Sequence, residues 1–182
     1  MQKRSHKLLA STLLEKEAGF RARRYEWAFL FGSFQPDCNP LSYLKGSIRA
    51  QRFAGHNYAN SKPFIQRRIA RLQNREHWNI WHYYTLGKLT HYLADAFTFP
   101  HNDHYNDTML AHHQYETELR AYLENYLKTA APQEELPADD LTGKLESLHD
   151  FYMHSKADMQ TDARYIWEAT GLLMAGCLPA AA

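Results

Sequence analysis

The segment that most constrains the fold is residues 78–97, which contain no proline and no run of β-branched residues and precede Pro100. This pattern predicts a single helix that ends before the proline. His91 and Asp95 are four residues apart, so their side chains should lie one above the other on one face. Gly87, one turn before His91, should leave room there for something other than a side chain. An imidazole and a carboxylate stacked beside such a gap suit a divalent metal ion.

The same pattern also fits a helix that presents His91 and Asp95 to solvent as its polar face. The residues that follow favour burial instead. His112 and Glu116 repeat the four-residue spacing on a second expected helix, residues 108–127, where they continue an apolar stripe and should point inward. Buried charge without a partner is costly, so we expect an ion or a counter-charge beside these side chains.

The order of these residues, with Pro100 directly before His101, resembles the core of the bacterial zinc-dependent phospholipase C family. The resemblance extends upstream to Asp37, at the end of the segment Phe-Gly-Ser-Phe-Gln-Pro-Asp, and to His56. It also reaches His6 near the start of the chain, and it covers about residues 5–127.

An all-α fold is therefore expected, in the form of a multi-helix bundle around a multinuclear zinc site. Residues 1–182 are long enough for one domain with its own core, and they contain neither an internal repeat nor a segment with strand periodicity. The aromatic-rich segment 23–34 should form a helix buried in that core. Further helices are expected at residues 5–18, 62–75 and 139–176, the last of them broken or bent near Gly143.

The resemblance implies two zinc sites. The first zinc ion would be held by Asp37, His56, His91 and Asp95. The second would be held by His101, His112 and Glu116. A third ion beside His6 is left open, because the corresponding family histidine acts with the amino group of an N-terminal tryptophan and this sequence starts with methionine.

The resemblance also implies a reaction. Asp37 matches a family aspartate that is both a zinc ligand and a candidate general base. A metal-activated water would attack the phosphodiester of a phospholipid and release the head group as a phosphorylated alcohol. Cys38 follows Asp37 where members that cleave phosphatidylcholine tend to carry an aromatic residue, so the head group is left open.

Two other functions are compatible with this pattern. Single-strand nucleases share the fold and the zinc cluster, but they tend to carry aspartate at the position of Glu116, which favours the phospholipase. Residues 45–75 contain eight lysines and arginines and no acidic residue. This stretch would attract a phosphodiester substrate, an anionic membrane surface in peripheral contact, or nucleic acid. The other alternative is a non-enzymatic helical domain that zinc holds together.

The composition of the chain limits its possible chemistry and location. Eleven histidines in a chain of nearly balanced charge, +1, are consistent with metal or acid–base chemistry. The two cysteines form no CxxC pattern, which favours free thiols in a reducing compartment. No apolar window has the length of a membrane span, and no secretory signal is visible. We therefore expect a cytoplasmic protein, or an exported one whose signal has already been removed.

Overall fold

The computed structural model describes residues 1–16, 20–38, 58–102, 108–131 and 140–179. Within these ranges the protein is all-α, as predicted, and no helix there is long and apolar enough to cross a bilayer. The elements are α1 (Lys3–Lys16), α2 (Arg23–Cys38), α3 (Tyr58–Gln73), α4 (Ile80–Ala96), the short 3-10 helix η2 (Phe99–His101), α5 (Met109–Thr129), α6 (Leu141–Met153) and α7 (Met159–Cys177).

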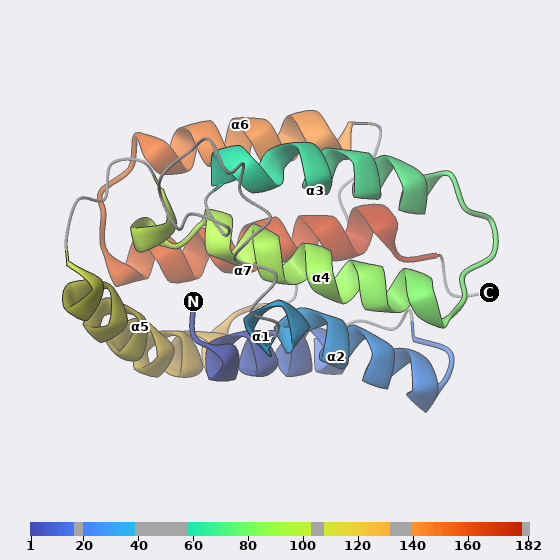
Figure 1. Cartoon of the computed structure of the whole chain (residues 1–182), viewed down its shortest axis with the longest axis horizontal. Coiled ribbons are helices and arrows are strands. Elements are labelled where there is room, and N and C mark those ends of the chain that lie inside the picture. The colour runs from blue at the N-terminus through green and yellow to red at the C-terminus, as the bar shows by residue number, and fades with distance from the viewer. Residues whose placement is uncertain (17–19, 39–57, 103–107, 132–139, 180–182) are drawn as a thin grey trace.

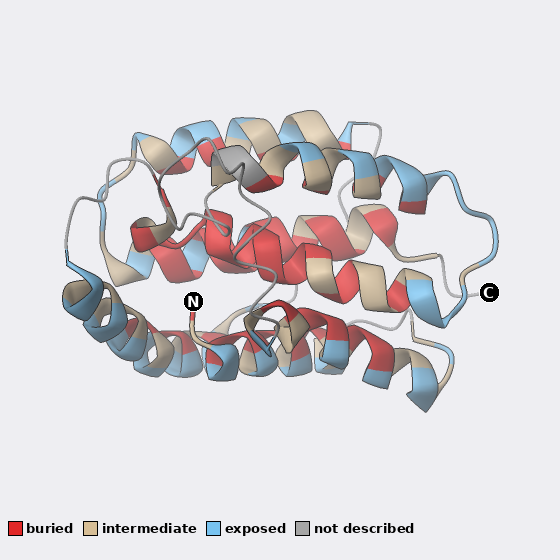
Figure 2. Ribbon diagram, viewed as in Figure 1, coloured by how far each residue is buried: buried red, intermediate tan, exposed pale blue. Residues whose placement is uncertain are grey.

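Helix α4 runs through the middle of the molecule (Figure 1). It packs against α2, α3 and α7, and Figure 2 shows it buried along most of its length. It begins where the side chain of Asn79 accepts a hydrogen bond from the Trp81 N–H, and the Asn79 N–H donates in return to Nδ1 of His82. The predicted helix 78–97 is thus confirmed to within a few residues at each end. His91 and Asp95 are fully buried, as are the leucines on the opposite side of the helix.

Helices α2 and α4 lie in parallel and in close contact. Tyr25 stacks on Tyr83 near their starts, with ring centroids 4.5 Å apart, and Asp37 approaches His91 near their ends. A Cβ atom added to Gly87 would lie 2.1 Å from the Phe29 carbonyl oxygen, so glycine is required here for the backbones to approach. The room expected at Gly87 is therefore present, but the backbone of α2 occupies it.

Two expectations about the elements were wrong. Helix α2 continues through the buried Pro36 to Cys38, and Asp37 therefore lies on a helix. The C-terminal segment breaks at residues 154–158 and not at Gly143. Gly143 lies in the first turn of α6, where its N–H donates to the Asp140 side chain, while Asp158 caps α7 in the same way.

Candidate metal centre

His91 and Asp95 form the centre of the site. The Nε2 atom of His91 lies 3.3 Å from Oδ2 of Asp95 and 3.6 Å from Oδ1 of Asp37. On the other side of the ring, Nδ1 lies 2.9 Å from the Ser33 carbonyl oxygen, which can only accept a hydrogen bond. Nδ1 therefore carries a proton, and in the neutral imidazole the lone pair of Nε2 points toward two carboxylates. Such an arrangement calls for positive charge at Nε2.

Helix α1 contributes His6 to the same place. Its ring stacks on His91 with centroids 3.8 Å apart, and its Nε2 lies 3.3 Å from Oδ1 of Asp95 and 3.9 Å from Oδ2 of Asp37. His6 is buried, and neither of its ring nitrogens makes a hydrogen bond within the described ranges. A buried imidazole in this state has an unused lone pair, as a metal ligand does before it binds its ion.

A second group lies next to the first, on η2 and α5. Oε1 of Glu116 is 3.2 Å from Nε2 of His101 and 3.1 Å from Nε2 of His112. Asp95 connects the two groups, because its Oδ1 lies 3.9 Å from Nε2 of His101. Thr108 fixes the start of α5 by accepting a hydrogen bond from the Ala111 N–H, which sets the helical phase that turns His112 and Glu116 toward the cluster.

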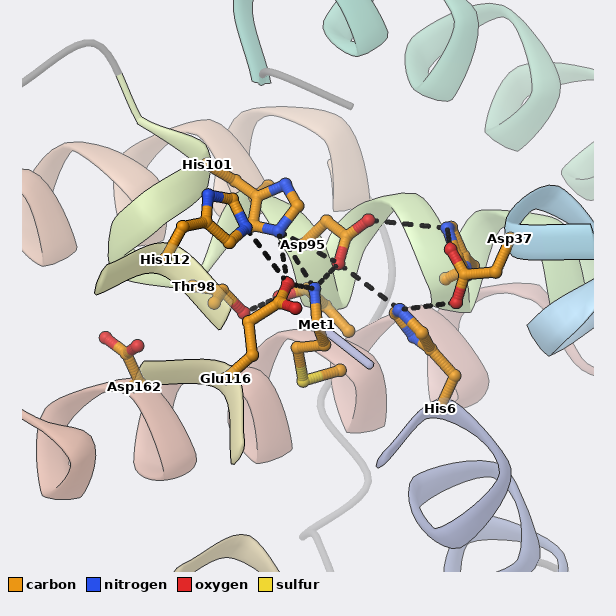
Figure 3. A network of polar contacts seen from close by, with 12 residues as sticks. Met1, His6, Asp37, Asp95, Thr98, His101, His112, Glu116 and Asp162 are labelled. Atoms are coloured by element: carbon orange, nitrogen blue, oxygen red, sulfur yellow. Dashed lines mark hydrogen bonds and ion pairs between the residues drawn. The ribbon is translucent and has the colours of Figure 1, made fainter. Parts of the chain in front are cut away.

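The amino group of Met1 lies between the two groups (Figure 3). Its nitrogen is 2.5 Å from Oδ1 of Asp95, 2.9 Å from Nε2 of His101 and 3.1 Å from Oε1 of Glu116. Burial lowers the pKa of this amine, but the Asp95 and Glu116 carboxylates outweigh it and raise the pKa to about 10. A positive charge thus occupies the point on which these lone pairs converge.

Each group can hold a metal ion. The ligand atoms of His6, His91 and Asp95 all lie within 4.8 Å of one another, and the same holds for His101, His112 and Glu116. Imidazole nitrogen and carboxylate oxygen are donors that zinc takes in proteins. The unused ring nitrogens of His6 and the Met1 ammonium between the groups both indicate that the site is built around cations.

The electrostatics keep the cluster in the protonation state that metal binding needs. Burial alone would raise the pKa of Asp95, but the Met1 ammonium and the neighbouring histidines hold it well below its usual range. The pKa of Glu116 is lowered as well, because the hydrogen bonds with His101 and His112 lower it further than burial raises it. Burial and the Met1 ammonium lower the pKa of His101, which leaves its ring neutral at pH 7.

One buried carboxylate near the cluster was not singled out from the sequence. Asp162, on α7, accepts hydrogen bonds from the Phe99 N–H (3.0 Å), the Tyr115 hydroxyl (3.0 Å) and the Tyr152 hydroxyl (2.8 Å). It therefore ties η2, which carries His101, to the helix that carries Glu116. Nothing in its local sequence connects it with residues so far away in the chain.

The structure brings nearly all of the predicted site residues together. Asp37, His91 and Asp95 converge as expected, and so do His101, His112 and Glu116. His6 joins the group of His91 directly. The predicted ligand His56 lies outside the described residues.

The comparisons with known proteins agree with this geometry. The model of the family described as zinc dependent phospholipase C matches residues 5–165, which is most of the chain. Comparisons with curated proteins and with solved structures gave no match.

Proposed function

Because the chain belongs to the zinc-dependent phospholipase C family, we propose that it hydrolyses the phosphodiester bond of phospholipids at this cluster. The observation that carries the proposal is the convergence of histidine nitrogens and carboxylate oxygens on two adjacent points. Phosphoesterases with two metal ions hold those ions close together, and histidine and carboxylate side chains are suitable ligands for zinc.

In this proposal the first zinc ion is held by His6, His91 and Asp95, with Asp37 beside them. The second is held by His101, His112 and Glu116. His56 stays a predicted ligand of the first ion. When bound, zinc supplies Lewis acidity toward the phosphoryl oxygens and lets water act as a nucleophile at neutral pH.

The side chains at the edge of the cluster would handle substrate and proton. His6, His91 and Asp95 are fully enclosed, whereas Asp37 is 13% exposed and His112 is 25% exposed. A phosphodiester would therefore reach the cluster at one of these two side chains, which lie at its opposite ends (Figure 3). As the water oxygen attacks phosphorus, Asp37 would accept its proton. The bond from phosphorus to the diacylglycerol oxygen breaks, and that oxygen takes up a proton.

Turnover by the zinc-loaded protein tests the proposal. The panel compares phosphatidylcholine, phosphatidylethanolamine, phosphatidylglycerol and single-stranded DNA at neutral pH. We expect release of phosphorylated head groups from at least one lipid. Cleavage of DNA alone would make the protein a nuclease. No cleavage of any phosphodiester, with zinc in both groups, would favour a non-enzymatic domain held together by zinc.

The role of Asp37 has its own test. Asp37→Asn keeps the size of the side chain and an oxygen ligand but removes the base, so turnover should fall by roughly 10²–10⁴-fold while most zinc stays bound. Asp150→Asn, at an exposed aspartate on α6, is the matched control and should leave turnover unchanged. Near-normal turnover in Asp37→Asn would show that another group accepts the proton.

A further inference from the structure

Large aromatic side chains are exposed on one surface of the α2–α4 pair. Trp27 and Phe31 of α2 are 70% and 52% exposed, and Trp81 of α4 is 70% exposed. The Phe31 ring lies 5.9 Å from the Tyr84 ring, which in turn lies 6.1 Å from the ring of Trp81. The rings of Phe31 and Phe34 meet edge to face at 5.6 Å. The half-buried rings of Phe34 and Tyr84 thus connect the exposed rings of Phe31 and Trp81, and Trp27 lies one turn before Phe31 on α2. We call this group the aromatic patch (Trp27, Phe31, Phe34, Trp81 and Tyr84).

Within the aromatic patch, Tyr84 packs against the core, whereas Trp27, Phe31, Phe34 and Trp81 do not belong to the core cluster of the described residues. Helix α2 contacts α4 through a face that includes Phe29, Gly32 and Ser33. Trp27, Phe31 and Phe34 follow at spacings of four and three on the opposite side of the helix. The sequence led us to expect these aromatic residues in the core, and for Trp27 and Phe31 that expectation was wrong. Exposed hydrophobic clusters of this kind mark surfaces that contact a partner or a membrane.

Positive charges surround the aromatic patch. The ammonium groups of Lys3 and Lys7, on α1, lie 5.2 and 4.4 Å from the centroid of the Phe34 ring. Lys88 lies 5.8 Å from that of Tyr84, and the exposed Arg23 precedes Trp27 by one turn of α2. Neither Lys3 nor Lys7 forms an ion pair within the described part of the chain. Their charges are therefore available to an anionic surface.

We infer that the aromatic patch docks the protein onto the surface of a phospholipid bilayer that contains anionic lipid. Tryptophan and tyrosine rings concentrate at the level of the lipid head groups, and lysines beside them add attraction to anionic phosphates. Phe34 lies one turn from Asp37 on the same helix, so the aromatic patch extends to the edge of the metal centre. The inference rests on the proposed function, because docking there would bring phosphodiesters to the cluster.

This surface differs from the basic stretch that the sequence suggested for membrane contact. The described part of that stretch, residues 58–75, contains α3, which lies on the other side of α4 from α2 (Figure 1). The aromatic patch combines hydrophobic rings with positive charge, whereas a run of charge alone is usually a solvated face.

The test compares the zinc-loaded protein with the double variant Trp27→Ser/Trp81→Ser. The control is Phe151→Ser/Tyr122→Ser, which removes two exposed aromatic residues from α6 and α5. Sedimentation with vesicles of phosphatidylcholine and phosphatidylglycerol measures binding, and a short-chain phospholipid below its micellar concentration measures turnover without an interface. Zinc content and melting temperature verify that both variants are folded.

We expect the patch variant to bind vesicles roughly 10- to 100-fold more weakly than wild type. Its hydrolysis of vesicle lipid should fall in parallel, whereas turnover of the monomeric substrate and all properties of the control should stay unchanged. Vesicle binding equal to that of wild type would overturn the inference. So would a change from dimer to monomer by light scattering with unchanged vesicle binding, which would assign the aromatic patch to a second copy of the chain. Vesicle binding through the patch without turnover of any lipid would refute the proposed function and leave the docking surface intact.

Discussion

Two fully buried carboxylates of this protein, Asp95 and Asp162, have opposite surroundings. Asp95 faces the Met1 ammonium and the ring nitrogens of His6 and His91. Asp162 accepts hydrogen bonds from a backbone N–H and from two tyrosine hydroxyls, all of them neutral donors. Burial is the same in both cases, so the difference lies in the partners.

The pKa of each group follows its partners. Burial raises the pKa of Asp162 from 3.8 to about 6, because the hydrogen bonds from Phe99, Tyr152 and Tyr115 only partly oppose it. The pKa of Asp95 is held well below its usual range by the cation and the histidines around it, although burial acts in the opposite direction. Neutral hydrogen-bond donors satisfy the Asp162 carboxylate without an ion, whereas the Asp95 carboxylate depends on positive charge beside it. This contrast distinguishes a structural carboxylate, Asp162, from the metal ligand that we propose, Asp95.

Removal of zinc should have the largest effect on the free energy of unfolding. The lost stability should come from the surroundings of Asp95 and not from those of Asp162. An ion that binds only the folded state stabilises it by about 4 kcal/mol when present at 1,000 times its dissociation constant, or roughly 8 kcal/mol for two such ions. A strong chelator should therefore lower the melting temperature clearly, and added zinc should restore it. An unchanged midpoint after demonstrated loss of zinc would show that metal and fold are not coupled.

Replacement of each carboxylate by its amide should give a smaller but more selective effect. In metal-free protein, Asp95→Asn removes the counter-charge of buried cations and should cost about 3–5 kcal/mol. Asp162→Asn keeps an acceptor oxygen and should change stability by less than about 2 kcal/mol. Urea unfolding gives both values, and elemental analysis of zinc-loaded samples should find zinc lost only from Asp95→Asn. The distinction between the two carboxylates would be wrong if both variants lost the same free energy of unfolding, or if both kept the same zinc content.

The pH dependence of stability should have opposite signs at the two positions. The pKa of Asp162 is higher in the folded state than in the unfolded state. The carboxyl group therefore stabilises the folded state below pH 3.8, and this stabilisation is lost as the pH rises through about 6. As the pH falls from 7 to 4, the free energy of unfolding of wild type should therefore rise by up to about 3 kcal/mol relative to that of Asp162→Asn. For Asp95 the pKa is lowered in the folded state, so the advantage of wild type over Asp95→Asn should be constant near neutral pH and should shrink as the pH falls below about 3.8. Unfolding of chelated protein from pH 7 down to about pH 2 measures both slopes, that of Asp162 above pH 3.8 and that of Asp95 below it. Slopes of the same sign would contradict this account.

The elements that the sequence predicted well are those defined by local chemistry. The helix over residues 78–97 depends on an unbroken segment before Pro100, and the helix expected over residues 108–127 follows a local apolar periodicity. The spacing of four that joins His91 to Asp95 and His112 to Glu116 is likewise a local property of a helix. Such features need no knowledge of the tertiary partners.

Features that depend on distant partners could not be predicted. The backbone of α2 fills the space at Gly87, and only the packed pair of helices shows this. The stacking of His6 on His91 joins α1 to α4, and Asp162 meets its three donors from three separate elements. The exposure of Trp27 follows from which face of α2 meets α4, and an aromatic-rich sequence does not specify that face.

The most direct test of the metal centre is anomalous diffraction from crystals of the zinc-loaded protein, recorded at the zinc absorption edge. We predict one anomalous peak among His6, His91 and Asp95 and another among His101, His112 and Glu116, with none beside Asp162. Loss of the first peak in Asp95→Asn crystals would connect it to that carboxylate. The absence of a peak at both groups in well-folded protein, with zinc bound elsewhere or not at all, would contradict the account.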